Sequence, residues 1–300
     1  MNFYNIKEIG ATDLGRAWAI ELIAVFANAS LAKRIERAEA RLIQDCARAA
    51  AHRVPAERLI VREMNDGVAV YVEPGTPFNK VAGLGFDGVP ASELLDALER
   101  EFAERAAPLQ FEVSTLADPE LVRTLTRRGY ELVGFENVLG VEPRELMPPL
   151  ASEIDVALAG PAEAEIWIDV VTTGFLTPDV FDGPPSHEEF ARDVLERVYR
   201  DTIGTPGFQR YLARRAGAIA GGASFRIHEG IAQLAGAATL PEHRRKGVQS
   251  ALLRHRLAEA ARRGCDVAVV TTQPGSKSQE NVQKAGFVLL YARAVLVKTG

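Results

Sequence analysis

Residues 237–253 read AATLPEHRRKGVQSALL and join two apolar runs through a short basic turn. Proline has no N–H to donate to a β-ladder, so a strand is expected to stop at Pro241. Three cations, residues 244–246, then precede Gly247 and an amphipathic run with helical spacing. A helix N-terminus offers unpaired N–H groups with partial positive charge, and glycine lets an anion approach them closely. The stretch therefore predicts a phosphate-binding or pyrophosphate-binding loop, the alternative being a solvated basic turn before an ordinary helix.

The residues on either side of this loop predict alternating strands and helices. Turn residues at Gly217 and Gly230 separate three strand-like runs, which indicates an antiparallel meander. Pro161 is expected to open one helix before the meander, and Ser186 is expected to cap a second one. The expected strands span residues 154–159, 208–213, 218–227, 231–240 and 266–272, and the long helix after the loop spans 248–263.

A similar order of elements occurs twice in the chain. Residues 109–133 read as strand, short helix, Gly-aromatic pair and strand, and residues 267–290 read the same way. The spacing is 18 positions from Phe111 to Gly129 in the first case and 19 from Val267 to Gly286 in the second. This shared order predicts a tandem duplication, the alternative being chance repetition of strand and helix.

Residues 142–149 lie between the two repeats and contain three prolines. Proline fixes φ and disfavours helix in the residue before it, so this segment predicts an extended linker. The expected domains are therefore residues 1–145 and residues 150–300.

The composition is that of a globular protein with enough apolar residues for a large core. The 300 residues are 47% hydrophobic and 25% charged, and the net charge of −5 argues against a general nucleic-acid binder. The two cysteines are far apart and have no metal-ligand spacing. The first residues lack the apolar core of a signal peptide, and no apolar run reaches the about 18 residues of a membrane span. A cytoplasmic protein without a metal, a membrane or a nucleic-acid partner is expected.

Residues 244–249 read RRKGVQ, and a Gly-Phe pair at 286–287 follows a short helical run that begins near residues 276–281. The first segment resembles motif A of the GNAT superfamily of acyl-CoA-dependent N-acyltransferases, which is usually Arg/Gln-x-x-Gly-x-Gly/Ala, and the second resembles motif B. The resemblance covers about half of the chain. It implies an α/β fold with a mixed (α+β) sheet, built here from two tandem GNAT-like domains, of which the first is degenerate and the second binds acetyl-CoA.

The resemblance also implies which residues hold acetyl-CoA, the co-substrate of the family. In GNAT proteins the strand before the loop binds the pantetheine arm, the loop amides bind the pyrophosphate, and the helix before Gly-Phe lines the other wall. Polar residues at such positions can instead cap or solvate helices. Carried over, the expected acetyl-CoA-binding residues are Ala237, Ala238, Thr239, Arg245, Lys246, Gly247, Val248, Gln249, Ser250, Ser278 and Asn281, with Ser276 a weaker candidate.

Two positions depart from the family pattern. Gln249 stands where Gly or Ala is usual, and Val282 stands where many members have a tyrosine that protonates the CoA thiolate. Either another group or water protonates the sulfur, or the domain is no longer an acyltransferase. The expected strand 231–240 contains no Asp or Glu to act as general base.

The catalytic residues are therefore unknown from the sequence, and catalysis can rest on proximity and backbone polarisation of the thioester. Weaker candidates are His187, His228 and Glu229 for a pocket, and Glu242 and His243 for a base.

The first half lacks the features of the cofactor loop. Residues 83–88 are glycine-rich and precede an expected helix at 92–106, but this turn has no cation and Asp87 would repel a phosphate. The first half is therefore expected to cover an edge of the active domain or to shape the acceptor pocket. Residues 34–53, rich in Ala, Arg and Glu, predict a solvated amphipathic helix.

The resemblance implies an acyltransferase that moves an acetyl group from acetyl-CoA to an amine of a small molecule or peptide, by direct attack in a ternary complex. One alternative is a catalytically inactive CoA-binding or regulatory module, which Gln249 and Val282 favour. Another is a scaffold whose halves build a homodimer interface. Residues 174–186 predict an acceptor loop in which Asp179 and Asp182 favour a cationic acceptor, but the fold does not identify the acceptor.

Overall fold

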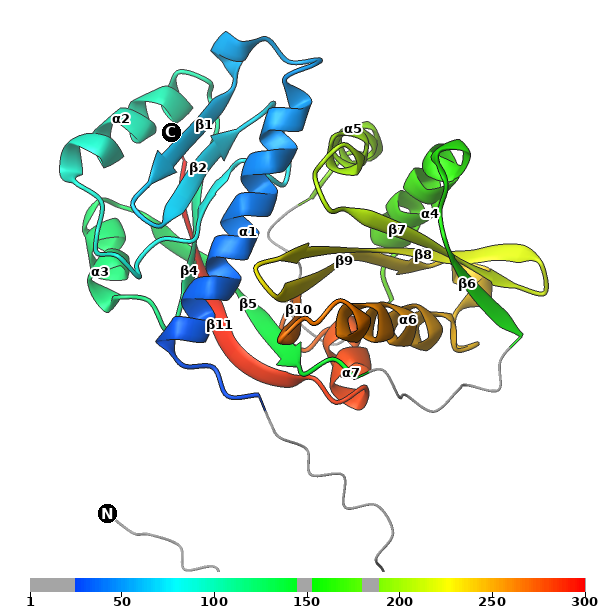
Figure 1. Ribbon diagram of the computed structural model, residues 1–300. Helices are drawn as coiled ribbons and strands as arrows, with labels where there is room; N and C mark the ends of the chain where they lie inside the picture. Colours follow the sequence, from blue (N-terminus) through cyan, green and yellow to red (C-terminus); the bar gives the residue numbers. More distant parts are fainter. Residues whose placement is uncertain (1–24, 145–152, 180–188, 300) are drawn as a thin grey trace, which may run out of the picture.

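The computed structural model describes residues 25–144, 153–179 and 189–299, and within these ranges the chain forms an eleven-stranded sheet with helices on both faces (Figure 1). The strand order is β1-β2-β3-β4-β11-β5-β10-β9-β8-β7-β6. The strands are β1 (Ile60–Met64), β2 (Gly67–Tyr71), β3 (Lys80–Ala82), β4 (Leu109–Ser114), β5 (Glu131–Val141), β6 (Ile154–Leu158), β7 (Gln209–Arg215), β8 (Ala218–His228), β9 (Ile231–Thr239), β10 (Val267–Thr272) and β11 (Val288–Lys298). The α-helices are α1 (Ala29–Ala50), α2 (Ser92–Ala103), α3 (Pro119–Arg127), α4 (Ala164–Leu176), α5 (Arg192–Ile203), α6 (Val248–Arg262) and α7 (Lys277–Lys284).

The second half contains the strands and helices that its sequence pattern predicts. β7, β8 and β9 form the antiparallel meander, with turns at Gly217 (φ +80°) and Gly230 (φ +78°). α6 begins at Val248, and Gly264 follows its end with φ +68°. The repeated unit is present as β4–α3–β5 and as β10–α7–β11. The mixed α/β fold predicted from the sequence is therefore confirmed.

The last strand of each repeated unit pairs with the other unit. β5 lies antiparallel to β10, and β11 lies antiparallel to both β4 and β5, so that Arg293 is opposite Ser114 on one side and Glu136 on the other. Figure 1 shows β11 running from the second half into the strands of the first. The sheet is therefore continuous across the predicted linker 142–149, of which residues 145–149 lie outside the described residues.

Two layers of helices cover the sheet. α2 and α3 pack on one face around Phe102 and Leu121, and α6 and α7 pack on the same face around Leu252 and Val282. α1, α4 and α5 cover the opposite face (Figure 1). In the part of the chain that the structure describes, no helix is both long enough and apolar enough to cross a membrane.

α1 lies across both halves of the molecule. The amphipathic helix predicted at residues 34–53 is present, but the prediction that it is solvated is wrong, because much of it is buried. The helix contacts β2 and β3 of the first half and β9 and α5 of the second. Ala32 and Ala38 are fully buried, and their small side chains let the helix approach the sheet closely. Glu36 is also buried, because it pairs with Arg293 of β11. The charged residues of α1 predicted contact with water. Some of them instead pair with residues distant in the sequence, which the local pattern does not show.

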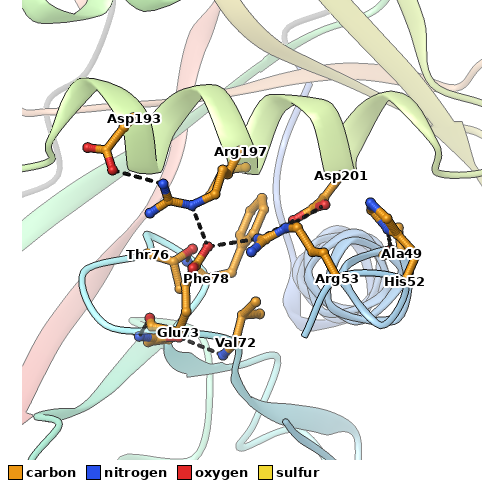
Figure 2. Close-up of polar contacts among 12 residues, drawn as sticks. Ala49, His52, Arg53, Val72, Glu73, Thr76, Phe78, Asp193, Arg197 and Asp201 are labelled. Carbon is orange, nitrogen blue, oxygen red and sulfur yellow. Dashed lines mark hydrogen bonds and ion pairs between the residues drawn. The ribbon is translucent and has the colours of Figure 1, made fainter. Parts of the chain in front are cut away.

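A chain of ion pairs also joins the two halves (Figure 2). Arg53, just after α1, lies 2.5 Å from Asp201 of α5 and 2.8 Å from Glu73, which follows β2. Arg197 of α5 lies 3.2 Å from the same Glu73 carboxylate and 2.8 Å from Asp193. Because Asp201 is buried and Arg53 balances its charge, this contact holds α5 against the first half.

α5 begins later than the sequence predicts. Ser186, the predicted cap, lies outside the described residues. The helix starts at Arg192 with Ala191 at its N-cap, so Glu189 precedes the helix and Asp193 is the acid of its first turn.

Candidate active site

β9 and β10 diverge near the middle of β9, which opens the sheet. Their parallel pairing ends where Val269 lies opposite Gln233. β9 then continues to Thr239 beside β8, whereas β10 continues beside β5. Gln233 is buried, while Ala235 and Ala237 further along the strand are exposed. The backbone of this stretch of β9 therefore borders the opening, where a ligand can pair with it.

A bulge in β9 shapes the opening and is held from both faces of the sheet. The pairing between β8 and β9 shifts register here, and Gly236 adopts φ +53°. On one face, Nε1 of buried Trp167 donates to the carbonyl oxygen of Ala223 at 3.1 Å. On the other face, buried Arg256 of α6 donates to the carbonyl oxygen of Ser224 at 2.9 Å. Both of these acceptors are on β8, opposite the bulge, and Arg256 also lies 3.4 Å from the carbonyl oxygen of Ala235 on β9. Core side chains thus hold the two strands at the bulge.

The basic loop after β9 turns sharply before α6. It contains one 3-10 turn at residues 241–243, after which Arg245 and Gly247 adopt φ of +60° and +84°. Arg244 donates to the carbonyl oxygen of Thr177 and so ties the loop to the end of α4. Arg245 and Lys246 are exposed. Lys246 donates through Nζ to the carbonyl oxygen of Glu242 at 2.8 Å, within the loop itself. Arg244 thus holds the loop to α4, while Arg245 and Lys246 stand at the surface beside the helix.

The N-terminus of α6 is open to an anion. Gly247 is its N-cap and provides no capping side chain, and the first turn contains no acid. Each of the other six α-helices in the described ranges has a capping side chain, an acid in its first turn, or both. Unpaired N–H groups, the helix dipole, Arg245 and Lys246 all favour negative charge at this position. The loop therefore has the features of a phosphate-binding site.

The structure places the predicted acetyl-CoA residues on three neighbouring elements. Ala237, Ala238 and Thr239 form the diverging end of β9, residues 245–250 form the loop and the first turn of α6, and α7 lies on the same face of the sheet as α6. The side chain of Ala238 is buried against α4, so its backbone alone is left for a ligand. Oγ1 of Thr239 is buried and has no hydrogen-bond partner among the described residues. This unpaired hydroxyl is consistent with a polar ligand at the end of β9.

α7 carries the remaining predicted residues. Ser278 is exposed and Asn281 is half-buried, whereas Oγ of Ser276 caps the helix by accepting from the N–H of Gln279 at 3.2 Å. The capping interpretation of Ser276 is thus observed. Val282 is buried among the residues that pack α6 and α7 onto the sheet. Its side chain is part of the core and supplies no acid for a thiolate.

The weaker candidates are not gathered in one place. Glu242 and His243 lie in the 3-10 turn of the basic loop, after the diverging end of β9. His228 and Glu229 lie at the turn between β8 and β9, beside Ile231 at the start of β9, which is the end of the strand away from the loop. His187 lies outside the described residues, as does Asp182 of the predicted acceptor loop.

Sequence reasoning missed a group of charged side chains beneath α1, which we call the seam cluster. Arg293 is central: its Nε donates to Glu36 at 2.8 Å, and its NH1 lies 3.4 Å from Glu136 and 3.8 Å from Glu112. Lys80 forms an ion pair with Glu112. The members are Glu36 and Glu39 of α1, Lys80 of β3, Glu112 of β4, Glu136 of β5 and Arg293 of β11. Because they come from five elements, no spacing of residues in the sequence reveals the cluster. The only sequence signal for it was the presence of charges within the apolar runs of β4 and β11.

The seam cluster contains more carboxylates than cations. Burial raises the pKa of Glu36 despite the nearby Arg293. Burial also opposes ionisation of Glu112, but the charges of Lys80 and Arg293 outweigh it and lower the pKa of this carboxyl. Burial, together with the charge of Glu112, raises the pKa of Glu136 to about 7. The cluster therefore holds a carboxyl group that exchanges its proton near neutral pH.

In the corresponding loop of the first half, residues 83–88, the backbone N–H groups already donate to a carboxylate of the same half. Oδ2 of Asp66 accepts from the N–H groups of Phe86 at 2.6 Å and Asp87 at 2.9 Å, and Lys33 of α1 pairs with Asp87. α1 also packs against this loop, since a Cβ added at Gly83 would lie 3.0 Å from the side chain of Ala40. Backbone groups that could bind a phosphate are already occupied here.

Replacing Asp66 with alanine is expected to lower the free energy of unfolding by about 1–3 kcal/mol, because two N–H groups lose their acceptor. Urea denaturation measures this change. Calorimetric titration is expected to give unchanged affinity for acetyl-CoA, since the basic loop lies in the other half. Unaltered stability would contradict the role of Asp66 as the internal anion of the loop.

Comparisons with known proteins agree with this geometry. Residues 177–287 match the acetyltransferase (GNAT) family. The chain is similar to a GCN5-related N-acetyltransferase from Kribbella flavida, with a TM-score of 0.60 and 19% identity over 87% of this chain and 95% of that one. It is also similar to a GCN5-related N-acetyltransferase from Sphaerobacter thermophilus, with a TM-score of 0.54 and 17% identity over 92% and 95% of the two chains. A comparison with curated proteins found no match.

A third solved structure, a tandem GNAT protein from the clavulanic acid biosynthesis pathway, aligns with a TM-score of 0.53 and 13% identity over 91% of this chain and 96% of that one. The second half of the chain therefore contains a GNAT acetyltransferase domain, and the chain as a whole has the fold of tandem GNAT proteins.

Proposed function

We propose that this protein transfers an acetyl group from acetyl-CoA to an amine, with residues 150–300 as the unit that binds acetyl-CoA. The open N-terminus of α6, which the basic loop connects to the diverging end of β9, is the observation that carries the proposal. This surface combines an anion site with a strand backbone that has no partner strand. A long ligand with a pyrophosphate at one end and amides along its length requires both.

Each part of this surface has a role in binding. The N–H groups of residues 247–250 hold the pyrophosphate, and Arg245 and Lys246 add positive charge. The backbone of residues 237–239 holds the pantetheine arm, while Ser278 and Asn281 form the opposite wall. Acetyl-CoA supplies an activated acetyl group, and the chain orients it toward the acceptor.

Residues 1–145 form the unit that shapes the acceptor side. α1 and β5 of this unit place Glu39 and Glu136 near the opening, whereas Asp179 of the predicted acceptor loop is already paired with Arg244 at 3.5 Å. Glu39 and Glu136 are partly exposed. Glu39 and Glu136 attract a cation, so the acceptor is a positively charged amine of a small molecule or peptide.

Replacing Gly247 with glutamate is expected to weaken acetyl-CoA binding by at least about 100-fold. The new carboxylate repels the pyrophosphate, and its backbone is strained at the φ of +84° that Gly247 adopts. Isothermal titration of the purified protein with acetyl-CoA measures the affinity.

Gly217→Glu is the matched control, because Gly217 also has positive φ and open space around it but lies at the β7–β8 turn. The control is expected to bind acetyl-CoA like the wild type. Unchanged affinity in Gly247→Glu would disprove the placement of the site. If the wild type bound no acetyl-CoA while Gly247→Glu kept its oligomeric state, the scaffold alternative would be favoured.

A CoA-binding module without turnover is the second candidate, and the burial of Val282 in the core favours it. The position that holds a tyrosine acid in many GNAT proteins provides none here. Micromolar binding of acetyl-CoA with no release of free thiol in the presence of amines would identify such a module.

A further inference from the structure

We propose that Glu136, which the first half contributes on β5, is the general base that takes the proton from the acceptor amine; this assignment rests on the proposed acetyl transfer. The last strand of each repeated unit pairs with the other unit, an arrangement that we call the exchange of strands. It brings β5 next to β10, one of the two strands that border the opening. The second half thereby acquires a carboxylate that its own strand β9 lacks.

The position of Glu136 follows from strand register. Glu136 lies opposite Arg293 on β11, and side chains of opposite residues point to the same face of a sheet. NH1 of Arg293 lies 3.4 Å from Oε2 of Glu136 and 3.4 Å from Oγ1 of Thr271. Thr271 is on β10, beyond the last residue that pairs with β9. Glu136 therefore lies on the α1 face beside the part of the sheet that has opened.

Access to solvent distinguishes Glu136 from the other carboxylates around Arg293. Its side chain is 26% exposed, whereas those of Glu36 and Glu112 are 1% and 2% exposed. A base must touch the proton that it removes, so the two sealed carboxylates are excluded from this role. Of the two, Glu112 acts on Glu136 through its charge.

The groups that face Glu136 leave its carboxylate basic enough for the reaction. Glu112 of β4 and Glu39 of α1 disfavour its ionisation, as burial does, while Lys80 of β3 and Arg293 of β11 favour it. The balance raises the pKa of Glu136 to about 7. A base with a pKa near the working pH is ionised in a useful fraction of molecules and still accepts a proton readily.

A second feature of the same face points to an amine. Gln233, the last residue of β9 that pairs with β10, donates through Nε2 to Glu39 at 3.2 Å. Its Oε1 is buried and has no hydrogen-bond partner among the described residues. An ammonium group next to Glu39 supplies both a positive charge and the N–H donor that this oxygen lacks.

The proton balance of the reaction then closes. The ammonium group gives one proton to Glu136 and becomes a nucleophile. Its nitrogen forms a bond to the acetyl carbonyl carbon, and the carbon–sulfur bond breaks with its electron pair on sulfur. The second nitrogen proton passes to the departing thiolate through solvent, so the products are an amide, a thiol and a protonated Glu136 that returns its proton to water.

The test compares wild-type protein with Glu136→Gln, Glu136→Asp and the control Glu131→Gln, which makes the same change at an exposed position on β5. The first readout needs no turnover. Carbon-13 NMR of labelled glutamate carboxyls is expected to show one group that titrates near pH 7, absent in Glu136→Gln and present in Glu131→Gln.

The second readout is thiol release from acetyl-CoA with two amine probes. Methylamine is protonated at pH 7 and needs a base, whereas hydroxylamine is already unprotonated. Glu136→Gln is expected to lower the rate of thiol release about 10²–10³-fold with methylamine and less than about threefold with hydroxylamine. Glu136→Asp is expected to regain part of the loss, and calorimetry is expected to show unchanged affinity for acetyl-CoA in all variants.

The outcomes separate the two proposals. Equal losses with both probes, or the lack of a carboxyl that titrates near neutrality, would overturn the assignment of Glu136 and leave acetyl transfer in place. If wild-type protein releases no thiol with either probe, the proposed acetyl transfer fails and the base fails with it.

Discussion

Replacing Arg293 with methionine lowers the free energy of unfolding by about 3–5 kcal/mol at pH 8, the largest stability effect we expect from a single substitution. Arg293 is 2% exposed and lies within 4 Å of Glu36, Glu112 and Glu136. Methionine fills a similar volume but leaves Lys80 as the remaining cation of the seam cluster. Removal of one partner from a buried charge network leaves the others uncompensated, which is costly in a medium of low dielectric constant.

The loss depends on pH in a defined direction. Without Arg293, the carboxyls of the seam cluster have higher pKa values in the folded state than in the unfolded chain. The folded state then holds protons that the unfolded state releases, so stability falls as the pH rises through this range. Urea denaturation is therefore expected to show a smaller loss for Arg293→Met at pH 5 than at pH 8.

A control and a second substitution make the result specific. Arg200 pairs with Glu165 on the surface at 2.8 Å, and Arg200→Met is expected to cost at most about 1 kcal/mol. Adding Glu36→Gln to Arg293→Met is expected to restore part of the stability, because it removes one of the uncompensated charges. A loss below about 1 kcal/mol, or one that is equal at both pH values, would show that the seam cluster is not held by charge compensation.

Neither half of the chain is expected to fold when residues 1–147 and 148–300 are produced as separate proteins. Without the second half, β5 lacks β10 and β11, and β4 lacks β11. Without the first half, β11 lacks β4 and β5, and α5 loses Arg53 and Glu73. Strand edges of this length left without partners favour aggregation.

Production of both pieces in the same cell is expected to give a soluble one-to-one complex, because the exchange of strands needs no covalent link between the halves. Gel filtration and circular dichroism distinguish the two situations, and calorimetric titration tests whether the complex binds acetyl-CoA. A folded, monomeric piece 148–300 that binds acetyl-CoA alone would contradict this prediction. It would show that β11 can pair within its own half.

Local patterns explain what could be predicted from the sequence. The meander of β7, β8 and β9 follows from period-two alternation between glycine turns, and the start of α6 follows from Pro241 and Gly247. These signals need only neighbouring residues. The assignment of residues in this loop to acetyl-CoA stays a prediction that the Gly247→Glu titration tests.

The exchange of strands could not be predicted, because the sequence of a strand does not specify its partner. β5 and β11 are both eleven residues long and both contain charges, so either could pair with β4. The seam cluster was missed for the same reason, since the neighbours of Glu136 come from other strands and from α1. Burial of α1 depends on small alanines and on charges with distant partners, which resemble a solvated helix when they are considered alone.

Because β11 lies in the middle of the sheet but at the end of the chain, the sheet can be completed only late in synthesis. The chain from Val141, the last residue of β5, to Val288, the first of β11, is 147 positions long. At about 5–20 residues per second, a ribosome needs about 7–30 s to make it. During that time β4 and β5 have left the ribosome without the strand that will separate them. Until β11 emerges and pairs with both strands, the edges of β4 and β5 are free to pair with other nascent chains. A cell that makes this protein must prevent such pairing.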